Sequence, residues 1–131
     1  MKVLVTGGAG FIGTEVCRLL ISRPNVQVIN VDSLTYAANL DCVNEFLTDD
    51  SYFFEEGDIR DSAKITTLLQ SFTPDAVVHL AAIVGDPACS REPDLTRQVN
   101  LKSTLDLFDL SRQAAENDPR ASDVHPGTVD G

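Results

Sequence analysis

The chain has 131 residues, a formal net charge of -10 and 43% hydrophobic residues. This length fits one domain, which can bury roughly two thirds of its unfolded surface and form a core of its own. The acidic balance argues against nucleic acid and anionic membranes as partners, because both bind clustered lysine and arginine. No run approaches the ~20 apolar residues that span a bilayer, and a strand begins at the second residue. We therefore expect a cytoplasmic protein without a signal peptide.

The first predicted strand, residues 2–6, leads into three glycines spaced three residues apart, Gly7, Gly10 and Gly13. In this pattern the first glycine permits a tight turn and the second lets a pyrophosphate approach the backbone. The third lets the following helix lie close on the sheet. That helix, predicted over residues 11–22, would direct its unpaired N–H groups and the positive end of its dipole at the phosphates.

Asp32 closes the second predicted strand, residues 26–31, and follows Gly13 by nineteen residues. There a carboxylate can accept hydrogen bonds from both hydroxyls of an adenosine ribose, and it repels a 2′-phosphate. The pattern predicts a site for the ADP half of a dinucleotide and favours NAD over NADP. A P-loop is excluded because no Gly-Lys-Ser/Thr follows the glycines, whereas a methyltransferase-type glycine loop and a plain strand-turn-helix corner stay open.

Strands and helices continue to alternate along the chain, which favours a parallel sheet with right-handed crossovers. The first helix is expected to bury one apolar face, made of Ile12, Val16, Leu19 and Leu20. The later predicted elements are a short helix at 40–48, a strand at 51–55, a helix at 62–72, a strand at 75–80 and a helix at 93–115. Two prolines, a glycine and little apolar periodicity then predict a domain at 1–116 and a disordered tail at 117–131.

Four stretches match a known sequence pattern, namely residues 6–13 (TGGAGFIG), 31–40 (VDSLTYAANL), 57–61 (GDIRD) and 74–82 (PDAVVHLAA), together with Val99-Asn100. Over residues 2–113 the chain resembles the extended short-chain dehydrogenase/reductases, and most closely their NAD-dependent nucleotide-sugar epimerases and 4,6-dehydratases. Residues 34–40 resemble the 4,6-dehydratases, whereas residues 83–89 resemble a different epimerase/dehydratase branch. The resemblance implies an α/β fold with a Rossmann-type parallel sheet, helices on both faces and the strand order 3-2-1-4. The sheet would be incomplete, because the fifth strand of the family falls where the tail is predicted.

The resemblance also implies which residues contact NAD. Phe11 and Ile12 lie in the glycine motif at the start of the first helix. Asp58 would lie near the exocyclic amine of the adenine and Ile59 against the face of the ring. The alternative for this segment is a helix N-cap, which Asp58 or Asp61 could supply equally well.

Leu80, Ala81 and Ala82 would lie where the fourth strand emerges toward the pyrophosphate and the nicotinamide ribose. For each of these residues an apolar, buried strand end is an equal alternative. Tyr36 and Asn39 fall in a loop that borders the adenosine in the resembling enzymes, and by themselves they are typical of an ordinary polar loop.

The catalytic pair of the resembling family is missing. Those enzymes move protons with a Tyr-x-x-x-Lys pair, because a tyrosine needs a nearby cation to reach a useful pKa. The two tyrosines of this chain, Tyr36 and Tyr52, are followed four residues later by Leu40 and Glu56. We therefore assign no catalytic residue.

The cysteines and histidines indicate no metal site. Cys17, Cys42 and Cys89 are far apart and lack the paired spacing of zinc ligands or a redox pair, so we expect them to be reduced. His79 lies in an apolar strand and is expected to be a hydrogen-bonded core or strand-end residue. His125 lies in the predicted tail and is expected to be solvated.

Three hypotheses follow for the function. The first is the NAD-binding portion of a nucleotide-sugar epimerase/4,6-dehydratase-like protein that has no turnover on its own. The second is a non-enzymatic NAD-binding module, and the third is a module that a partner chain completes, which would then bind a nucleotide sugar. In the implied strand order residues 76–80 form an apolar open edge without charge or proline. This edge predicts a homo-oligomer or a strand contributed by another chain.

Overall fold

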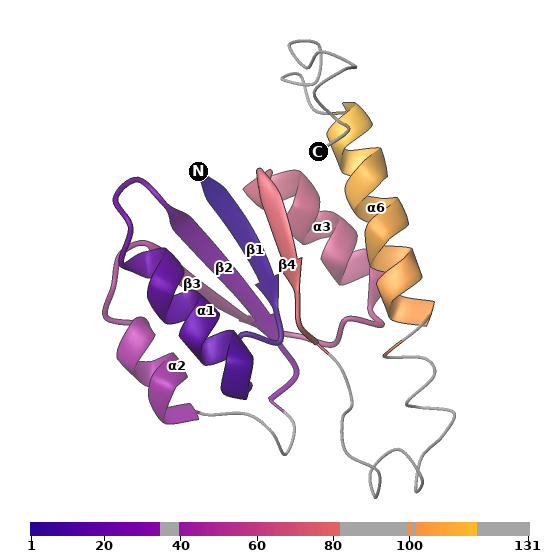
Figure 1. Cartoon of the computed structure of the whole chain (residues 1–131). Helices are drawn as coiled ribbons and strands as arrows, with labels where there is room; N and C mark the ends of the chain where they lie inside the picture. The colour runs from indigo at the N-terminus through magenta and orange to yellow at the C-terminus, as the bar shows by residue number, and fades with distance from the viewer. Residues whose placement is uncertain (35–39, 82–99, 101, 118–131) are drawn as a thin grey trace, which may run out of the picture.

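The structure, a computed structural model, describes residues 1–34, 40–81, 100 and 102–117 (Figure 1). Its elements, in chain order, are β1 (Lys2–Thr6), α1 (Phe11–Ile21), β2 (Gln27–Asp32), α2 (Leu40–Phe46), β3 (Tyr52–Glu56), α3 (Ser62–Phe72), β4 (Ala76–His79) and α6 (Ser103–Asn117). The predicted elements are confirmed, with ends that differ by one or two residues. The exception is the start of the last helix: α6 begins at Ser103, and the predicted start at residue 93 lies outside the described residues.

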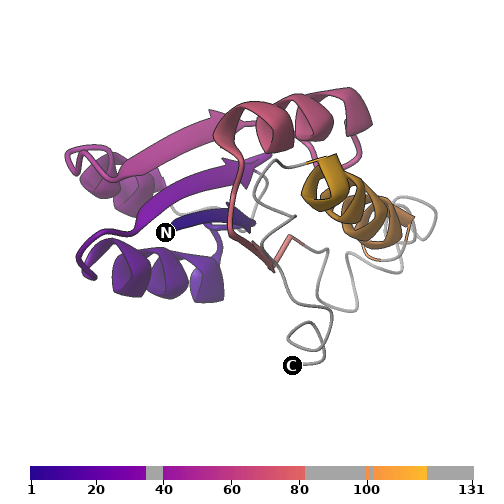
Figure 2. The same ribbon diagram turned by 90° about the horizontal axis from the view of Figure 1, so that it is seen from above.

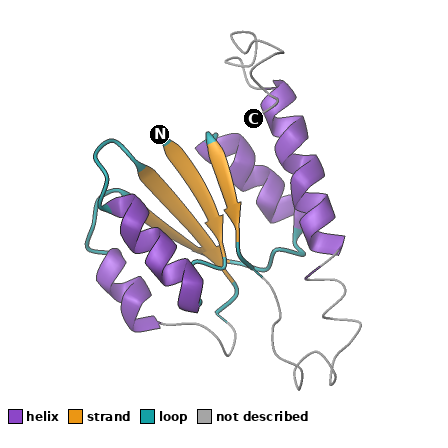
Figure 3. Cartoon of the chain, in the orientation of Figure 1, coloured by secondary structure: helices purple, strands orange, loops and turns teal. Residues whose placement is uncertain are grey.

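The described strands form one parallel sheet in the order β3-β2-β1-β4 (Figures 1 and 3). This order confirms the predicted Rossmann-type topology. Leu4 of β1 lies opposite Ile29 on one side and Val77 on the other. Because all the strands are parallel, the loops that follow β1, β2 and β4 lie at the same end of the sheet, formed by the carboxyl ends of the strands. Such folds bind ligands at this end.

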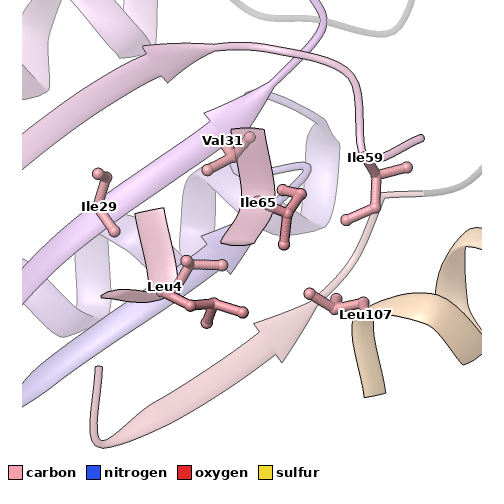
Figure 4. Packing of buried hydrophobic residues seen from close by; sticks show 7 residues of the cluster. Leu4, Ile29, Val31, Ile59, Ile65 and Leu107 are labelled. Atoms are coloured by element: carbon pink, nitrogen blue, oxygen red, sulfur yellow. The ribbon is translucent and has the colours of Figure 1, made fainter. Parts of the chain in front are cut away.

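Helices cover both faces of the sheet, as predicted (Figure 2). Alternate residues of each strand point to opposite faces. Leu4 and Val31 pack with Ile65 and Leu69 of α3 and with Leu107 of α6 (Figure 4). On the other face, the cluster is made of Val3, Val5, Val28, Cys17, Phe46 and Tyr52, the last three from α1, α2 and β3.

The buried face of α1 differs from the predicted one. Ile12 and Leu19 are 65% and 57% exposed, whereas Gly13, Thr14 and Cys17 are buried. The apolar spacing was misleading because α1 lies very close to the loop and the sheet at its first turn. Only small side chains fit in this gap, so Gly13 and Thr14 face it and Ile12 is exposed, whereas Leu20, further along the helix, packs against the core as predicted.

The ends of α3 are set by local interactions. Its N-cap is Asp61, whose carboxylate accepts a hydrogen bond from the Lys64 N–H. At the other end Thr73 adopts a left-handed conformation with φ of 49° and donates its N–H to the Leu69 carbonyl. Asp61, rather than Asp58, therefore begins this helix.

Among the described residues β4 pairs with β1 alone. Its residues, Ala76–His79, are all half-buried, whereas residues 3–6 of β1 are fully buried. The open edge expected from the strand order is thus present in the described part of the chain. No helix in that part is long and apolar enough to span a membrane. Residues 118–131, which hold the predicted tail, lie outside it, and the division at residue 116 stays a prediction.

Candidate functional site

The loop between β1 and α1 is tied to the end of β2. Its four consecutive N–H groups all donate hydrogen bonds within the protein. The pairs are Gly7 to the Val31 carbonyl (2.9 Å), Gly8 to Asn30 Oδ1 (2.8 Å), Ala9 to Asp32 Oδ2 (2.9 Å) and Gly10 to the Gly7 carbonyl (3.2 Å). The shape of the loop is therefore fixed by β2.

The next three N–H groups, at the start of α1, are different. In the described part of the chain Phe11, Ile12 and Gly13 donate no backbone hydrogen bond, and the first one of the helix runs from Thr14 to the Gly10 carbonyl (2.9 Å). No side chain caps α1, and its first turn holds no acidic residue. Three N–H donors and the positive end of the helix dipole thus face outward together, an arrangement that suits an anion.

The three positions of the motif differ in why they hold glycine. Gly7 has φ of +72°, and a Cβ there would lie 2.7 Å from the Ala81 nitrogen. A Cβ on Gly13 would lie 2.1 Å from the Gly7 carbonyl oxygen. Both positions therefore require glycine for the fold itself.

Gly10 is not required by the fold. A Cβ there would meet only the Gly7 carbonyl oxygen, at 3.4 Å, which is ordinary van der Waals contact. Its φ of -77° and ψ of -179° are open to any residue. A glycine at this position keeps the surface beside the free N–H groups clear, which is the expected requirement for a closely approaching pyrophosphate.

Asp32 lies at the end of β2 and is already hydrogen-bonded. Its Oδ2 accepts from the Ala9 N–H at 2.9 Å and its Oδ1 from the Leu34 N–H at 2.8 Å. A carboxylate has about four acceptor sites, so each oxygen can accept one further hydrogen bond. Asp32 thus shapes the loop and retains capacity for the two hydroxyls of a ribose.

Asn30 is a site residue that the sequence analysis missed. Its fully buried amide accepts from the Gly8 N–H through Oδ1 and donates from Nδ2 to the Tyr52 hydroxyl at 2.9 Å. Burial raises the pKa of Tyr52 to about 12, so this hydroxyl keeps its proton. The signal in the sequence was a single polar residue inside the apolar run of β2, since a buried amide needs partners for its polar atoms.

Cys17 lies under the same loop and is a free, buried cysteine. Burial, and secondly the negative charge of Asp32, raise the pKa of its thiol to about 12. Cys42 also forms no disulfide among the described residues, as expected, and its Sγ accepts a hydrogen bond from Arg18 Nη2 at 3.7 Å, whereas Cys89 lies outside the described residues. No cluster of metal-binding side chains occurs among the residues that the structure describes.

The segment after β3 is engaged within the protein. Both carboxylate oxygens of Asp58 accept hydrogen bonds from Arg60 Nε at 3.0 Å, and these bonds are the main cause that lowers the pKa of Asp58. Ile59 is 8% exposed and packs in the core on the α3 side (Figure 4). Ile59 therefore offers little surface to a ligand.

Leu80 and Ala81 follow β4 and lie against the glycine loop. The Leu80 N–H donates to the Thr6 carbonyl at 2.9 Å and to Thr6 Oγ1 at 3.1 Å, and the Ala81 N–H donates to the same Oγ1 at 3.2 Å. Both residues are half-buried. Three residues named from the sequence, Ala82, Tyr36 and Asn39, lie outside the described residues.

Residues 3–129 match the NAD dependent epimerase/dehydratase family. The chain belongs to this family. NAD is the cofactor that the family name states, and the family expected from the sequence resemblance is confirmed. The match covers the glycine loop, Asp32 and the end of β4 in one stretch.

Relatives in this family are nucleotide-sugar enzymes. The dTDP-glucose 4,6-dehydratase of Salmonella typhimurium is 41% identical over 113 residues, which are 86% of this chain and 31% of that protein. A solved dTDP-glucose 4,6-dehydratase from Streptomyces venezuelae, with NAD and TYD bound, has a TM-score of 0.80 at 34% identity, covering 87% of this chain and 36% of that one. For a UDP-glucose 4-epimerase from Thermotoga maritima, solved with UDP-glucose, the TM-score is 0.77 at 32% identity, over 87% of this chain and 35% of that one. The chain thus spans about a third of the length of these relatives.

The glycine geometry predicts that substitution by alanine lowers the stability of the fold much more at Gly13 than at Gly10. Gly13→Ala should lower the free energy of unfolding by at least about 2 kcal/mol, because its Cβ collides with backbone that cannot move independently. Gly10→Ala should change it by about 1 kcal/mol or less. Urea denaturation followed by circular dichroism measures both values, and equal losses for the two variants would contradict the geometry.

Proposed function

We propose that the chain binds NAD at the amino terminus of α1 and is the NAD-binding portion of a nucleotide-sugar epimerase/4,6-dehydratase-like protein. The observation that carries this proposal is the pairing of Gly10, which the fold does not require, with three outward-facing N–H groups. Membership of an NAD dependent family supports the same cofactor.

In this proposal the N–H groups of Phe11, Ile12 and Gly13 hold the pyrophosphate, and Gly10 leaves it room. Asp32 accepts the hydroxyls of the adenosine ribose with its remaining acceptor sites. When bound, NAD supplies a nicotinamide ring that accepts and returns a hydride.

The remaining proposed contacts with NAD are to the adenine on one side of the pyrophosphate and to the nicotinamide ribose on the other. We propose that Asp58 lies beside the adenine while its carboxylate stays hydrogen-bonded to Arg60. Ile59 would contact the adenine only with the small exposed part of its side chain. We propose that Leu80 and Ala81 contact the pyrophosphate and the nicotinamide ribose, and the sequence resemblance proposes the same for Ala82.

We infer that this chain has no turnover by itself. The sequence contains no Tyr-x-x-x-Lys, so proton transfer to and from a sugar needs groups from outside it. The nucleotide sugar would accordingly bind only where further residues or another chain complete the site. A non-enzymatic NAD-binding module and a partner-completed enzyme are the alternative functions, and turnover of a nucleotide sugar after addition of a partner chain would favour the latter.

Cofactor binding should raise the melting temperature, because a ligand that binds only the folded state stabilises it by mass action. We expect NAD and ADP-ribose to raise it more than NADP does. Gly10→Val should abolish the shift while the melting temperature without ligand stays close to that of the unmodified chain. Differential scanning fluorimetry at millimolar cofactor measures this, with Gly10→Ala as the smaller-volume control. Equal shifts with NAD and NADP, or an undiminished shift in Gly10→Val, would argue against the site.

Asp32→Asn tests the ribose contact with the least damage to the loop. The amide keeps one acceptor oxygen for the backbone but loses the charge that binds the ribose hydroxyls and repels a 2′-phosphate. NAD binding should weaken by on the order of 1.5–3 kcal/mol, and the preference for NAD over NADP should shrink. Isothermal titration calorimetry measures both, with the exposed Asp50→Asn as the matched control. An unchanged NAD to NADP ratio would place the ribose elsewhere.

We further infer that, in the absence of other proteins, the open edge of β4 pairs with a strand of a second copy of this chain. Among the described residues this edge pairs with no further strand, and natural edges are protected by charge, proline or a bulge. Beside it, between α3 and α6, lies a groove of about 920 Å³ whose wall includes Val77, Leu69 and Leu110.

Ala76→Lys, which adds a charge to this edge, should shift the chain toward a monomer of 14.2 kDa in sedimentation equilibrium at micromolar concentration. Ala63→Lys adds the same charge at an exposed position of α3 and should leave the association unchanged. A monomer at every concentration, for the unmodified chain, would refute the assembly.

A further inference from the structure

The ring of His79 links three elements at the edge of the sheet. His79 ends β4, and its Nδ1 lies 2.6 Å from Thr6 Oγ1 on β1. Its Nε2 lies 2.8 Å from Thr104 Oγ1 on α6. The ring therefore bridges the strand that leads into the glycine loop and the helix that covers this side of the sheet.

The neighbouring hydrogen bonds fix the direction of this bridge. Thr6 Oγ1 already accepts from the N–H groups of Leu80 and Ala81, and these groups cannot accept in return. The Thr6 hydroxyl proton must then point to His79 Nδ1, which is consequently the unprotonated nitrogen. The neutral ring carries its proton on Nε2 and donates it to Thr104 Oγ1.

The direction of the hydrogen bond that Thr104 donates is fixed as well. Thr104 Oγ1 lies 3.0 Å from the Asn100 carbonyl oxygen, which can only accept, so Thr104 donates its own proton there. A single tautomer of His79 thus satisfies every group in the series. A second proton on the ring would place an Nδ1–H donor opposite the Thr6 hydroxyl. Thr6 Oγ1 would then lose its acceptor and could no longer accept from both Leu80 and Ala81 in the present geometry.

At Thr6, this series of hydrogen bonds reaches the candidate site. Ala81 packs so closely on Gly7 that a Cβ on that glycine would lie 2.7 Å from the Ala81 nitrogen. The Thr6 hydroxyl holds the backbone of Leu80 and Ala81 in this contact. Whatever orients that hydroxyl also orients the exit of β4 beside the glycine loop.

We propose that His79, as the neutral Nε2–H tautomer, is a positioning residue that orients the Thr6 hydroxyl and so holds Leu80 and Ala81 in place beside the cofactor. The link to the cofactor rests on the proposed NAD site, whereas the tautomer does not. His79 touches neither substrate nor reacting atoms in this role. Its protonation should loosen the exit of β4 and weaken NAD binding.

The groups around the ring agree with a neutral histidine. Burial lowers the pKa of His79 below its usual value, and within the described part of the chain the hydrogen-bond partners of the ring are both hydroxyls. The lysines on or beside the packed elements bind other groups, namely Lys2 to Thr73, Lys64 to Glu55, and Lys102 to Asp106. The other charged side chains of α6 are Asp109, Arg112 and Glu116, of which the last two pair with each other. Since the folded state disfavours the charged ring, the free energy of unfolding is retained above the ordinary histidine pKa of about 6.5 and decreases as the pH falls below it. NAD binding should weaken at a lower pH, where the ring of the folded protein takes up its proton.

The tautomer can be observed directly in the full chain. The sequence has two histidines, so His125→Gln leaves His79 as the single one. A long-range ¹H–¹⁵N correlation spectrum at neutral pH should show a protonated Nε2 and an unprotonated Nδ1. On acidification the amide resonances of Leu80 and Ala81 should titrate together with the ring. An Nδ1–H form, averaged tautomers, or amides that ignore the titration would overturn the proposal without bearing on the NAD site.

The effect on the cofactor is tested with two variants. His79→Leu removes the acceptor for Thr6 and should weaken NAD binding about tenfold, the loss of one buried hydrogen bond. His79→Asn retains an amide oxygen near the position of Nδ1 and should restore most of the affinity. The affinity of the unmodified chain should fall on acidification, whereas that of His79→Asn should not. Coincident pH profiles for these two proteins would refute the positioning role, whereas absence of NAD binding with an intact tautomer and titration would refute the proposed function alone.

Discussion

The hydrogen bonds between the glycine loop and the end of β2 are the constraint on which the rest of the site depends. Four successive N–H groups, from Gly7 to Gly10, have partners inside the protein, and three of those partners belong to β2. The loop is therefore held in shape before any ligand arrives. Because these bonds use the first four amides, it is the next three that remain for an anion, and their direction follows from the start of α1.

Buried and half-buried polar side chains hold this region from both faces of the sheet. On the α1 side Asn30 joins Gly8 to Tyr52, and on the α6 side His79 joins Thr6 to Thr104. A buried polar group without a partner costs roughly 1–3 kcal/mol, so such groups are stable only when the whole series is satisfied. The carboxyl ends of the strands are thus coupled by hydrogen bonds where an ordinary core would have apolar contacts alone. This polar layer lies directly behind the surface that we assign to NAD.

The sheet itself is asymmetric. β1 and β2 have a neighbour on each side and are buried, whereas β4 pairs only with β1 among the described residues and its side chains are half-buried. The chain spans about a third of the length of its relatives, and its sequence lacks the Tyr-x-x-x-Lys pair. In the proposed function, cofactor recognition and proton transfer are separate along the sequence, because the proposed NAD site uses backbone amides near residue 10 and proton transfer needs side chains that this sequence lacks.

The sequence by itself determined the alternation of strands and helices, a parallel sheet, the glycine loop and the carboxylate at Asp32. These features follow from local spacing and from the handedness of parallel crossovers, whereas the order of the strands was predicted from the family resemblance. Only the tertiary structure decided that the fold itself does not require glycine at position 10 and that Ile59 belongs to the core. It also decided that Asn30 hydrogen-bonds to the glycine loop and that His79 hydrogen-bonds to Thr6. These properties arise from contacts between residues 22 to 73 positions apart, which the register of the parallel strands brings together and which no local pattern records.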